Sequence, residues 1–147
     1  MVIQRKELNM PALKYSRQRE AIMNFLMTRK DHPTADVVYS SVRHEFPNIS
    51  LGTVYRNLTL LADLGEISRL RLGDGIDHFD ADTSPHYHFI CKDCGRVIDL
   101  NMSALEEVDR FNETSLDGNR ITGHITYFYG SCAECCHRQT QDTTNVS

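Results

Sequence analysis

The sequence lacks the segments that carry a chain into or across a membrane. No apolar run approaches the ~20 residues of a membrane-spanning helix. Residues 1–20 are basic but have no apolar stretch typical of a secretory signal. These absences predict a cytoplasmic chain with no membrane partner.

Motifs of several enzyme classes are also missing. There is no nucleophile elbow, no phosphate-binding loop and no H-x-E…P-C-x-x-C pattern of the zinc deaminases. The sequence therefore favours a protein that is not an enzyme. A hydrolytic or redox centre built from its histidines and aspartates stays open as an alternative.

The five cysteines are an odd number, and four of them form two C-x-x-C pairs. In a chain without an export signal, this favours thiolates on a metal over disulfides. Cys91, Cys94, Cys132 and Cys135 predict a closed, structural four-thiolate zinc site, because each C-x-x-C presents two sulfurs from one turn. Reduced core cysteines or a thioredoxin-like redox pair are the alternatives, but no βαβ pattern surrounds either motif. Cys136 is left as a spare thiol.

Charge is distributed unevenly along the 147 residues, whose net charge is −4. Residues 1–56 hold nine Lys/Arg and five Asp/Glu, a net charge of +4, whereas residues 57–147 hold seven and fifteen, a net charge of −8. A basic first third is expected when one lobe meets phosphates and the other does not. Charge runs are also common on ordinary solvated surfaces.

Helix signals dominate the first part of the chain. Ser16, Thr34 and Ser50 are good N-cap residues, each followed by apolar residues at helical spacing. They predict three helices, the second running to about Phe46 and the third stopping at Gly65.

A hairpin is predicted directly after the third helix. Residues 66–72 alternate like a strand, residues 73–75 are a tight turn, and residues 76–79 return antiparallel. Three helices followed by a hairpin predict a winged helix-turn-helix DNA-binding domain over residues 1–82. A generic small α+β domain fits the same elements.

Residues 83–136 are expected to form a second, α/β lobe, which makes the fold class α+β. Its predicted elements are strands at 86–90, 96–100 and 120–130 and a helix at 103–113. A lobe of this size has a small core, so zinc and dimerisation would both stabilise it. Residues 137–147 are predicted to be a disordered polar tail.

Polar side chains on the third helix are suited to a major groove, and basic ones at the start of the first helix to phosphates. The candidate DNA contacts are Lys14, Arg17, Arg19, Ser50, Thr53, Tyr55, Arg56 and Asn57. An ordinary solvated helix face explains the third helix equally well.

A second group of possible metal ligands combines imidazoles with carboxylates. His86 and His88 share one face of a strand, Asp99 lies on the neighbouring strand, Asp80 ends the hairpin, and His32 follows the first helix. Such ligands suit a divalent transition metal. A site fed from both lobes would fix how the lobes sit. Each residue also has a structural explanation, such as a helix breaker, a turn residue or an ion-pair partner.

Between Tyr15 and Cys135 the chain resembles the ferric uptake regulator (Fur) superfamily, and within it the peroxide-sensing members. The matching stretches read SRQREAI, HPTADVVY, FPNISLGTVYRNL, DHFD, HYHFICKDCGRVID and YFYGSCAEC. The resemblance implies a homodimeric transcriptional repressor that binds double-stranded DNA at an A·T-rich palindromic operator. It also implies a C-terminal α/β dimerisation lobe, a structural zinc on the four cysteines, and a regulatory metal that closes the dimer.

Carried over by position, the resemblance places regulatory Fe²⁺ or Mn²⁺ on His32, Asp80, His86, His88 and Asp99. Iron-sensing relatives commonly have Glu where this chain has Asp80 and Asp99, so the resemblance favours a peroxide sensor. It implies that peroxide oxidises His32 or His86 at bound iron and that the repressor then releases metal and DNA. The alternatives are an iron- or zinc-sensing repressor of the same fold, a zinc module that binds only protein, and a metalloenzyme.

The sequence departs from the family pattern at the first helix and at an additional metal site, among other places. Ser16-Arg17-Gln18-Arg19 replaces the usual Thr-Pro-Gln-Arg at the first helix. An additional metal site of many members is expected to be incomplete, because Pro85 and Tyr87 stand where a His and an Asp are usual, although Glu106 and His124 are present.

Overall fold

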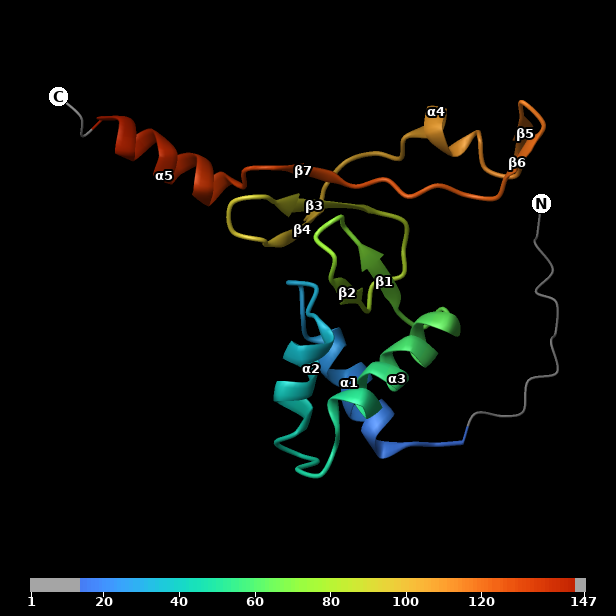
Figure 1. The fold of residues 1–147 in the computed structure, drawn as a ribbon, viewed down its shortest axis with the longest axis vertical. Helices are drawn as coiled ribbons and strands as arrows, with labels where there is room; N and C mark the ends of the chain where they lie inside the picture. The colour runs from blue at the N-terminus through green and yellow to red at the C-terminus, as the bar shows by residue number, and fades with distance from the viewer. Residues whose placement is uncertain (1–13, 145–147) are drawn as a thin grey trace.

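The N-terminal part of the computed structural model is built from three helices and a hairpin (Figure 1). The structure describes residues 14–144. In chain order the elements are α1 (Arg17–Met27), α2 (Ala35–Val42), α3 (Leu51–Asp63), β1 (Ser68–Arg71) and β2 (Asp77–Asp80). β1 and β2 pair antiparallel, with Ser68 opposite Asp80. This is the element order that the sequence predicts.

Capping residues explain where the helices begin and end. The Ser16 and Ser50 hydroxyl oxygens accept hydrogen bonds from the N–H groups of Arg19 and Thr53, at 3.3 and 3.1 Å. Thr34 precedes α2 without such a bond, and α2 ends at Val42, one turn before the predicted end. Gly65, with φ 74°, follows α3 in the left-handed conformation that suits a helix stop.

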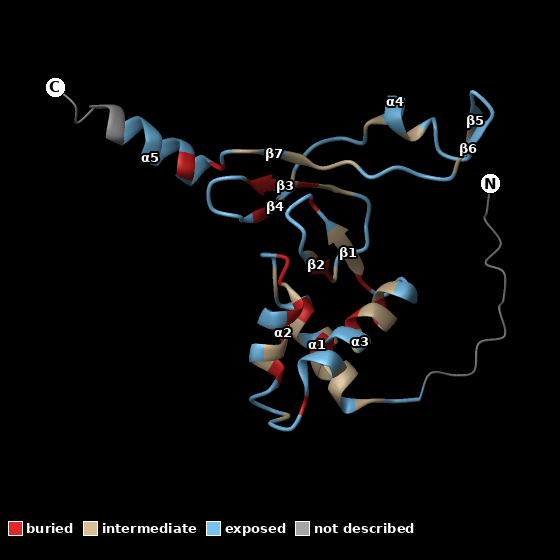
Figure 2. Ribbon diagram, viewed as in Figure 1, coloured by how far each residue is buried: buried red, intermediate tan, exposed pale blue. Residues whose placement is uncertain are grey.

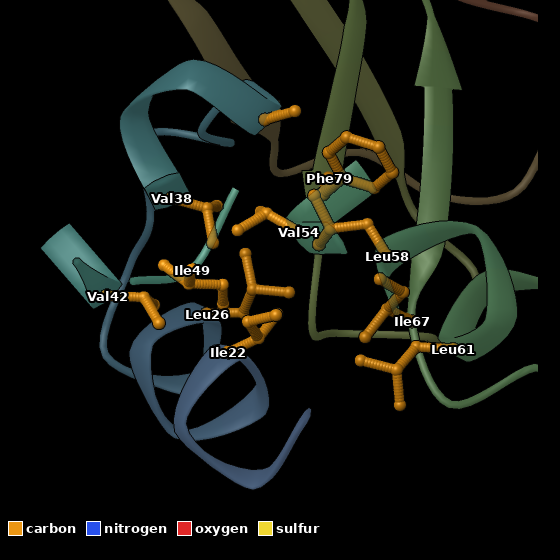
Figure 3. Close-up of a cluster of buried hydrophobic side chains, with 11 residues drawn as sticks. Ile22, Leu26, Val38, Val42, Ile49, Val54, Leu58, Leu61, Ile67 and Phe79 are labelled. Atoms are coloured by element: carbon orange, nitrogen blue, oxygen red, sulfur yellow. The ribbon is translucent and has the colours of Figure 1, made fainter. Parts of the chain in front are cut away.

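One apolar core unites these helices with the hairpin. Figure 3 shows Ile22 and Leu26 of α1, Val38 of α2 and Val54 of α3 converging on a common centre. Phe79 of β2 is 0% exposed and packs against the same cluster. Because side chains alternate along a strand, packing Phe79 inward turns its neighbours to the opposite face of the hairpin.

The C-terminal part is built around a three-stranded sheet with longer extensions (Figure 1). Its elements are β3 (Tyr87–Cys91), β4 (Val97–Leu100), α4 (Glu106–Asp109), β5 (Thr114–Leu116), β6 (Asn119–Ile121), β7 (Phe128–Gly130) and α5 (Ala133–Thr144). The sheet order is β4-β3-β7. β3 pairs antiparallel with β4, placing His88 opposite Asp99, and parallel with β7.

Three predictions about this part were wrong. The helix expected at 103–113 is the single turn α4, and its supposedly inward residues Val108 and Phe111 are 37% and 40% exposed. The strand expected at 120–130 consists of the short strands β6 and β7. The tail expected to be disordered continues as α5 to Thr144. Figure 2 shows that these extensions are mostly exposed. In the single chain they therefore have little packed core that could stabilise longer helices or strands.

The hairpin contacts the C-terminal sheet directly. Leu72, which follows β1, is 3% exposed and packs with Ile90 and Val97. At Gly73, with φ 77°, an added Cβ would collide with the Tyr127 hydroxyl. The left-handed backbone favours glycine there, and any larger residue would also have to displace the Tyr127 hydroxyl. Among residues 14–144 no helix is long and apolar enough to cross a membrane.

Candidate functional site

The four predicted zinc ligands come together at one end of the C-terminal sheet. Cys91 ends β3, Cys94 follows in the turn to β4, and Cys132 and Cys135 lie at the start of α5. The sulfurs of Cys91 and Cys135, and those of Cys94 and Cys132, are 3.8 Å apart, and all four lie within 4.8 Å of one another. Sulfurs about 2.3 Å from a tetrahedral zinc would be separated by roughly 3.8 Å. The donor set therefore fits zinc.

Backbone donors favour the thiolate at this cluster. Burial acts to raise the pKa of the Cys91 thiol, but backbone N–H groups, first that of Cys132, lower it below its ordinary value. The Cys132 N–H lies 3.2 Å from Cys91 Sγ. Cys136 lies outside the cluster, exposed, with its thiol 3.5 Å from the Ser131 carbonyl oxygen. A closed set of four thiolates suits a structural rather than a reactive metal.

The five predicted regulatory ligands also come together, between the helical part and the C-terminal sheet. His32 comes from the loop after α1 and Asp80 from the end of β2, whereas His86, His88 and Asp99 come from the C-terminal part. One ligand atom of each lies within 4.8 Å of all the others. Residues 67 positions apart in the chain, His32 and Asp99, are thereby joined at one site.

Each imidazole presents its Nε2 atom to both carboxylates. From Asp80 Oδ2, the Nε2 atoms of His32, His86 and His88 lie at 3.2, 3.1 and 3.3 Å. From Asp99 Oδ1, the corresponding distances are 2.7, 3.1 and 3.4 Å. Ligand atoms about 2.1 Å from one ion and at right angles would lie roughly 3 Å apart. The five atoms therefore have the spacing of a coordination sphere.

Hydrogen bonds on the far side of the rings fix which nitrogen faces the centre. Nδ1 of His32 lies 3.3 Å from the Val97 carbonyl oxygen, and Nδ1 of His86 lies 2.7 Å from that of Ser84. Because a carbonyl only accepts, Nδ1 carries the hydrogen in both rings, which leaves the Nε2 lone pair for a cation. The donor set and its orientation fit a divalent transition metal.

The same arrangement explains the electrostatics of the cluster. Burial favours the neutral form of Asp80, but hydrogen bonds from His32 and His88 hold the pKa of that carboxyl well below its usual range. Burial also acts to lower the pKa of the His32 imidazole, but Asp80 and Asp99 outweigh it and raise that pKa. The Asp80 carboxylate therefore favours its anionic form, which can accept hydrogen bonds from protonated imidazoles or bind a metal cation in place of those protons.

Most candidate DNA contacts lie on α1 and α3, where several bond to other groups of the chain. The Tyr55 hydroxyl donates to Asp77 of the hairpin at 2.8 Å, and the Asn57 amide donates to the Thr53 carbonyl at 3.0 Å. Arg17 and Arg56 are exposed cations. The Arg19 guanidinium donates to the Lys14 carbonyl oxygen, and Ser50 caps α3. Contact of these residues with DNA stays a prediction.

Sequence reasoning did not single out His78, which the structure buries beside the five-residue cluster at 7% exposure. Strand alternation could have indicated this position, because His78 lies two residues before Asp80 on the same face of β2. Glu106 and His124 form no further cluster: within residues 14–144 only the two groups above gather three or more metal-ligating side chains. His124 instead contacts Asn112, at 2.9 Å.

Comparison with known proteins identifies the family of the chain. The sequence profile of the ferric uptake regulator family matches residues 11–128. The chain belongs to the ferric uptake regulator family. Among its relatives, a peroxide-responsive repressor PerR of Staphylococcus aureus is 38% identical over 128 residues, which cover 87% of this chain and 86% of that protein.

Two solved structures of the family share the fold. The ferric uptake regulator Fur of Helicobacter pylori, described as having three functional metal binding sites, has a TM-score of 0.67 at 28% identity. The match covers 84% of this chain and 83% of that one. The peroxide stress regulator of Campylobacter jejuni has a TM-score of 0.65 at 28% identity, with 80% and 88% covered. Both comparisons span the helical part and the sheet of this Fur-family chain.

Proposed function

We propose that this chain is a metal-dependent, DNA-binding transcriptional repressor of the cytoplasm that senses peroxide. Residues 1–82 bind DNA, residues 83–136 dimerise and hold metal, and residues 137–147 are an appended tail. The four cysteines hold structural zinc, and His32, Asp80, His86, His88 and Asp99 hold Fe²⁺ or Mn²⁺. The observation that carries the proposal is the convergence of three Nε2 atoms and two aspartate oxygens from both parts of the chain.

Because the ligands come from two parts of the chain, a metal bound at this site holds one part in a fixed position relative to the other. His32 and Asp80 are attached to the helices and hairpin, whereas His86, His88 and Asp99 are attached to the sheet. Binding a cation stabilises only those arrangements in which all five groups converge. In a homodimer this fixes the separation of the two DNA-binding domains, which must match the half-sites of an A·T-rich palindromic operator.

Peroxide sensing follows from the identity of the ligands. Ferrous iron held by these five groups would supply the redox chemistry that activates peroxide. One oxygen atom of the peroxide would be inserted into a ring C–H bond of His32 or His86, and the other would leave as water. The oxidised ring binds a cation less well, so convergence of the five groups is lost and operator binding with it. The 38% identity to a peroxide-responsive repressor supports this branch over iron sensing.

Sensing of iron concentration is the second candidate. The likeness to the Helicobacter pylori structure, which is that of a ferric uptake regulator, supports it. In this case operator binding follows the concentration of free metal, and peroxide leaves the ligands unchanged.

Metal-dependent operator binding tests the proposal in its general form. We expect zinc-loaded protein to bind a palindromic A·T-rich duplex tightly only when Mn²⁺ is added, and His88→Ala to lose this response. His44→Ala is the matched control, because His44 is exposed and lies outside the cluster. Equal binding by wild type with and without Mn²⁺, or by His88→Ala and wild type, would contradict the proposal.

A further inference from the structure

His78 lies where the hairpin meets the regulatory cluster, and none of the roles described above uses it. Its side chain is 9% exposed. The ring Nδ1 lies 3.0 Å from the backbone oxygen of His32, and Nε2 lies 2.7 Å from Oδ2 of Asp74. A carbonyl oxygen only accepts hydrogen bonds, so Nδ1 donates to the His32 oxygen, while Nε2 faces the Asp74 carboxylate. His78 is thus held at both ends of its ring.

The residue that His78 contacts has an unusual backbone conformation. His32 has φ 55°, in the left-handed region that residues other than glycine rarely adopt. Such a conformation persists only where the surroundings impose it. The Phe79 N–H donates to the Pro33 carbonyl at 3.0 Å, and Thr34 forms an isolated antiparallel bridge with His78. β2 therefore holds residues 32–34 through its backbone and through the His78 ring.

The other end of the pair lies in the turn between β1 and β2. Asp74 follows Gly73, which packs against the Tyr127 hydroxyl, and Leu72, which is buried against the C-terminal sheet. The Asp74 carboxylate also accepts the Ile76 N–H at 3.1 Å, through its other oxygen, Oδ1. The turn is thereby held on the sheet while its carboxylate holds His78. A displacement of this turn is transmitted through two hydrogen bonds to the backbone of His32.

We propose that Asp74 and His78 are positioning residues, which hold His32 in the conformation required for the regulatory metal and connect that metal to the turn of the hairpin. The inference rests on the proposed function of the five-residue site. Neither residue is a ligand. β2 also carries Asp80, two residues after His78 on the same face, so this strand positions two of the five ligand groups. Because coupling between sites is reciprocal, a change in the turn on DNA binding alters metal affinity, and metal binding alters the turn.

Metal affinity of zinc-loaded, full-length protein tests the pair. We expect His78→Gln to bind Mn²⁺ at least about tenfold more weakly than wild type, the size of effect that loss of a partner behind a ligand produces. His44→Gln is the matched control, because it makes the same replacement at an exposed histidine. Asp74→Asn should weaken Mn²⁺ binding less, and the double variant should be no weaker than His78→Gln, because the two residues act as a unit.

A measurement without the regulatory metal separates positioning from a general effect on folding. Nuclear magnetic resonance of wild-type zinc-loaded protein should show a hydrogen on Nδ1 of His78 that is protected from exchange with solvent by its bond to the His32 carbonyl. In Asp74→Asn this hydrogen should exchange faster, because the ring loses the partner that orients it. This readout also applies if His78→Gln fails to fold. A His78 Nδ1 hydrogen in wild type that exchanges as fast as that of the exposed His44 would overturn the inference.

Different results would overturn the proposed metal site and the proposed role of Asp74 and His78. Unchanged Mn²⁺ affinity in His88→Ala would overturn the proposed site and the inference with it. Loss of affinity in His88→Ala together with wild-type affinity in both His78→Gln and Asp74→Asn would overturn the pair alone. Saturating Mn²⁺ should restore operator binding by His78→Gln, since a positioning residue lowers metal affinity without contacting DNA. Operator binding that stays weak at saturation would contradict the proposed role.

Discussion

The Asp99 carboxylate is the most accessible ligand group of the proposed regulatory site. Its side chain is 38% exposed, whereas that of Asp80 is 8% exposed and that of His32 is 2% exposed. Asp99 Oδ1 lies 2.7 Å from His32 Nε2 and 3.1 Å from His86 Nε2, the two rings proposed to be oxidised. The open side of the site therefore lies beside Asp99, and the length of this side chain controls access to it.

Replacing Asp99 with Glu should retain metal-dependent operator binding and abolish the response to peroxide. The added methylene lets the carboxylate reach over the open side, where peroxide must approach. We expect histidine oxidation to fall at least about tenfold, a loss of ~1.4 kcal/mol in barrier stabilisation, as measured by peptide mass spectrometry. Asp63→Glu is the control, because Asp63 is exposed on α3. Oxidation of Asp99→Glu at the wild-type rate would show that this side chain does not control access.

The ligand residues were predictable, but the residues that orient them were not. The H-x-H spacing and the family resemblance indicated all five ligands. Nothing in the sequence indicated that the His32 carbonyl meets His78, because that contact depends on the left-handed backbone at residue 32 and on the pairing of β2 with the loop after α1. Sequence patterns indicate which residues can be metal ligands more reliably than they indicate the tertiary contacts that orient those ligands.

At the scale of single elements, the helices of the DNA-binding part depend on their first residues. The Ser50 hydroxyl satisfies the Thr53 N–H at 3.1 Å, whereas Thr34 makes no such bond at the start of α2. α3 carries most of the candidate contacts to bases, so its first turn must be ordered for them to be presented. Capping connects the stability of this helix to DNA binding.

Replacing Ser50 with Ala should lower the free energy of unfolding by about 1 kcal/mol, because the Thr53 N–H loses its partner. Thr34→Ala should cost less, since no capping bond is removed there. Urea unfolding followed by circular dichroism measures both. Equal losses in the two variants would show that the Ser50 bond does not stabilise α3.

Elements whose signals are local agreed with the sequence, and elements that depend on distant contacts did not. Ser16 and Ser50 correctly predicted where α1 and α3 begin, and Gly65 correctly predicted where α3 ends. The apolar residues at 105, 108 and 111 predicted a longer helix than α4, and β-formers between 120 and 130 predicted a longer strand than β7. An apolar residue that faces a partner chain has the same pattern as one that faces the core of its own chain, so the sequence could not separate them.

At the scale of the whole molecule, the C-terminal part has little core of its own. Outside the cysteine cluster, its buried apolar residues are Ile90 and Val97, joined by Leu72 from the hairpin. Several large apolar side chains there are exposed, with Ile125 at 79% and Tyr129 at 68%. Zinc and a second copy of the chain would supply the missing stabilisation.

Removing one zinc ligand should destabilise this part severely. We expect Cys94→Ser to lose bound zinc and several kcal/mol of unfolding free energy, because metal binding is coupled to folding. Cys136→Ser should retain both, since its sulfur lies outside the cluster. Zinc content by elemental analysis and thermal unfolding measure the two effects. Full stability of Cys94→Ser without zinc would contradict a structural role.

The exposed edge of the sheet predicts where the two copies meet. β7 pairs with β3 along one edge, and Tyr129 projects from it. Tyr129→Glu should weaken dimerisation at least about tenfold in sedimentation experiments, because the interface would have to bury a charge, at a cost of ~1.4 kcal/mol or more. Tyr15→Glu is matched in exposure, at 69%, and should leave dimerisation unchanged. A Tyr129→Glu dimer as tight as wild type would place the interface elsewhere.

Oxidation of its own metal-site histidines is the proposed means by which this chain detects peroxide. The most direct test is intact and peptide mass spectrometry of iron-loaded protein before and after a short peroxide pulse, with manganese-loaded protein as control and operator binding measured in parallel. We predict the gain of one oxygen atom at His32 or His86 with iron alone, together with loss of operator binding. An unchanged mass, with operator binding that follows free metal, would contradict the claim and assign the protein to metal-concentration sensing.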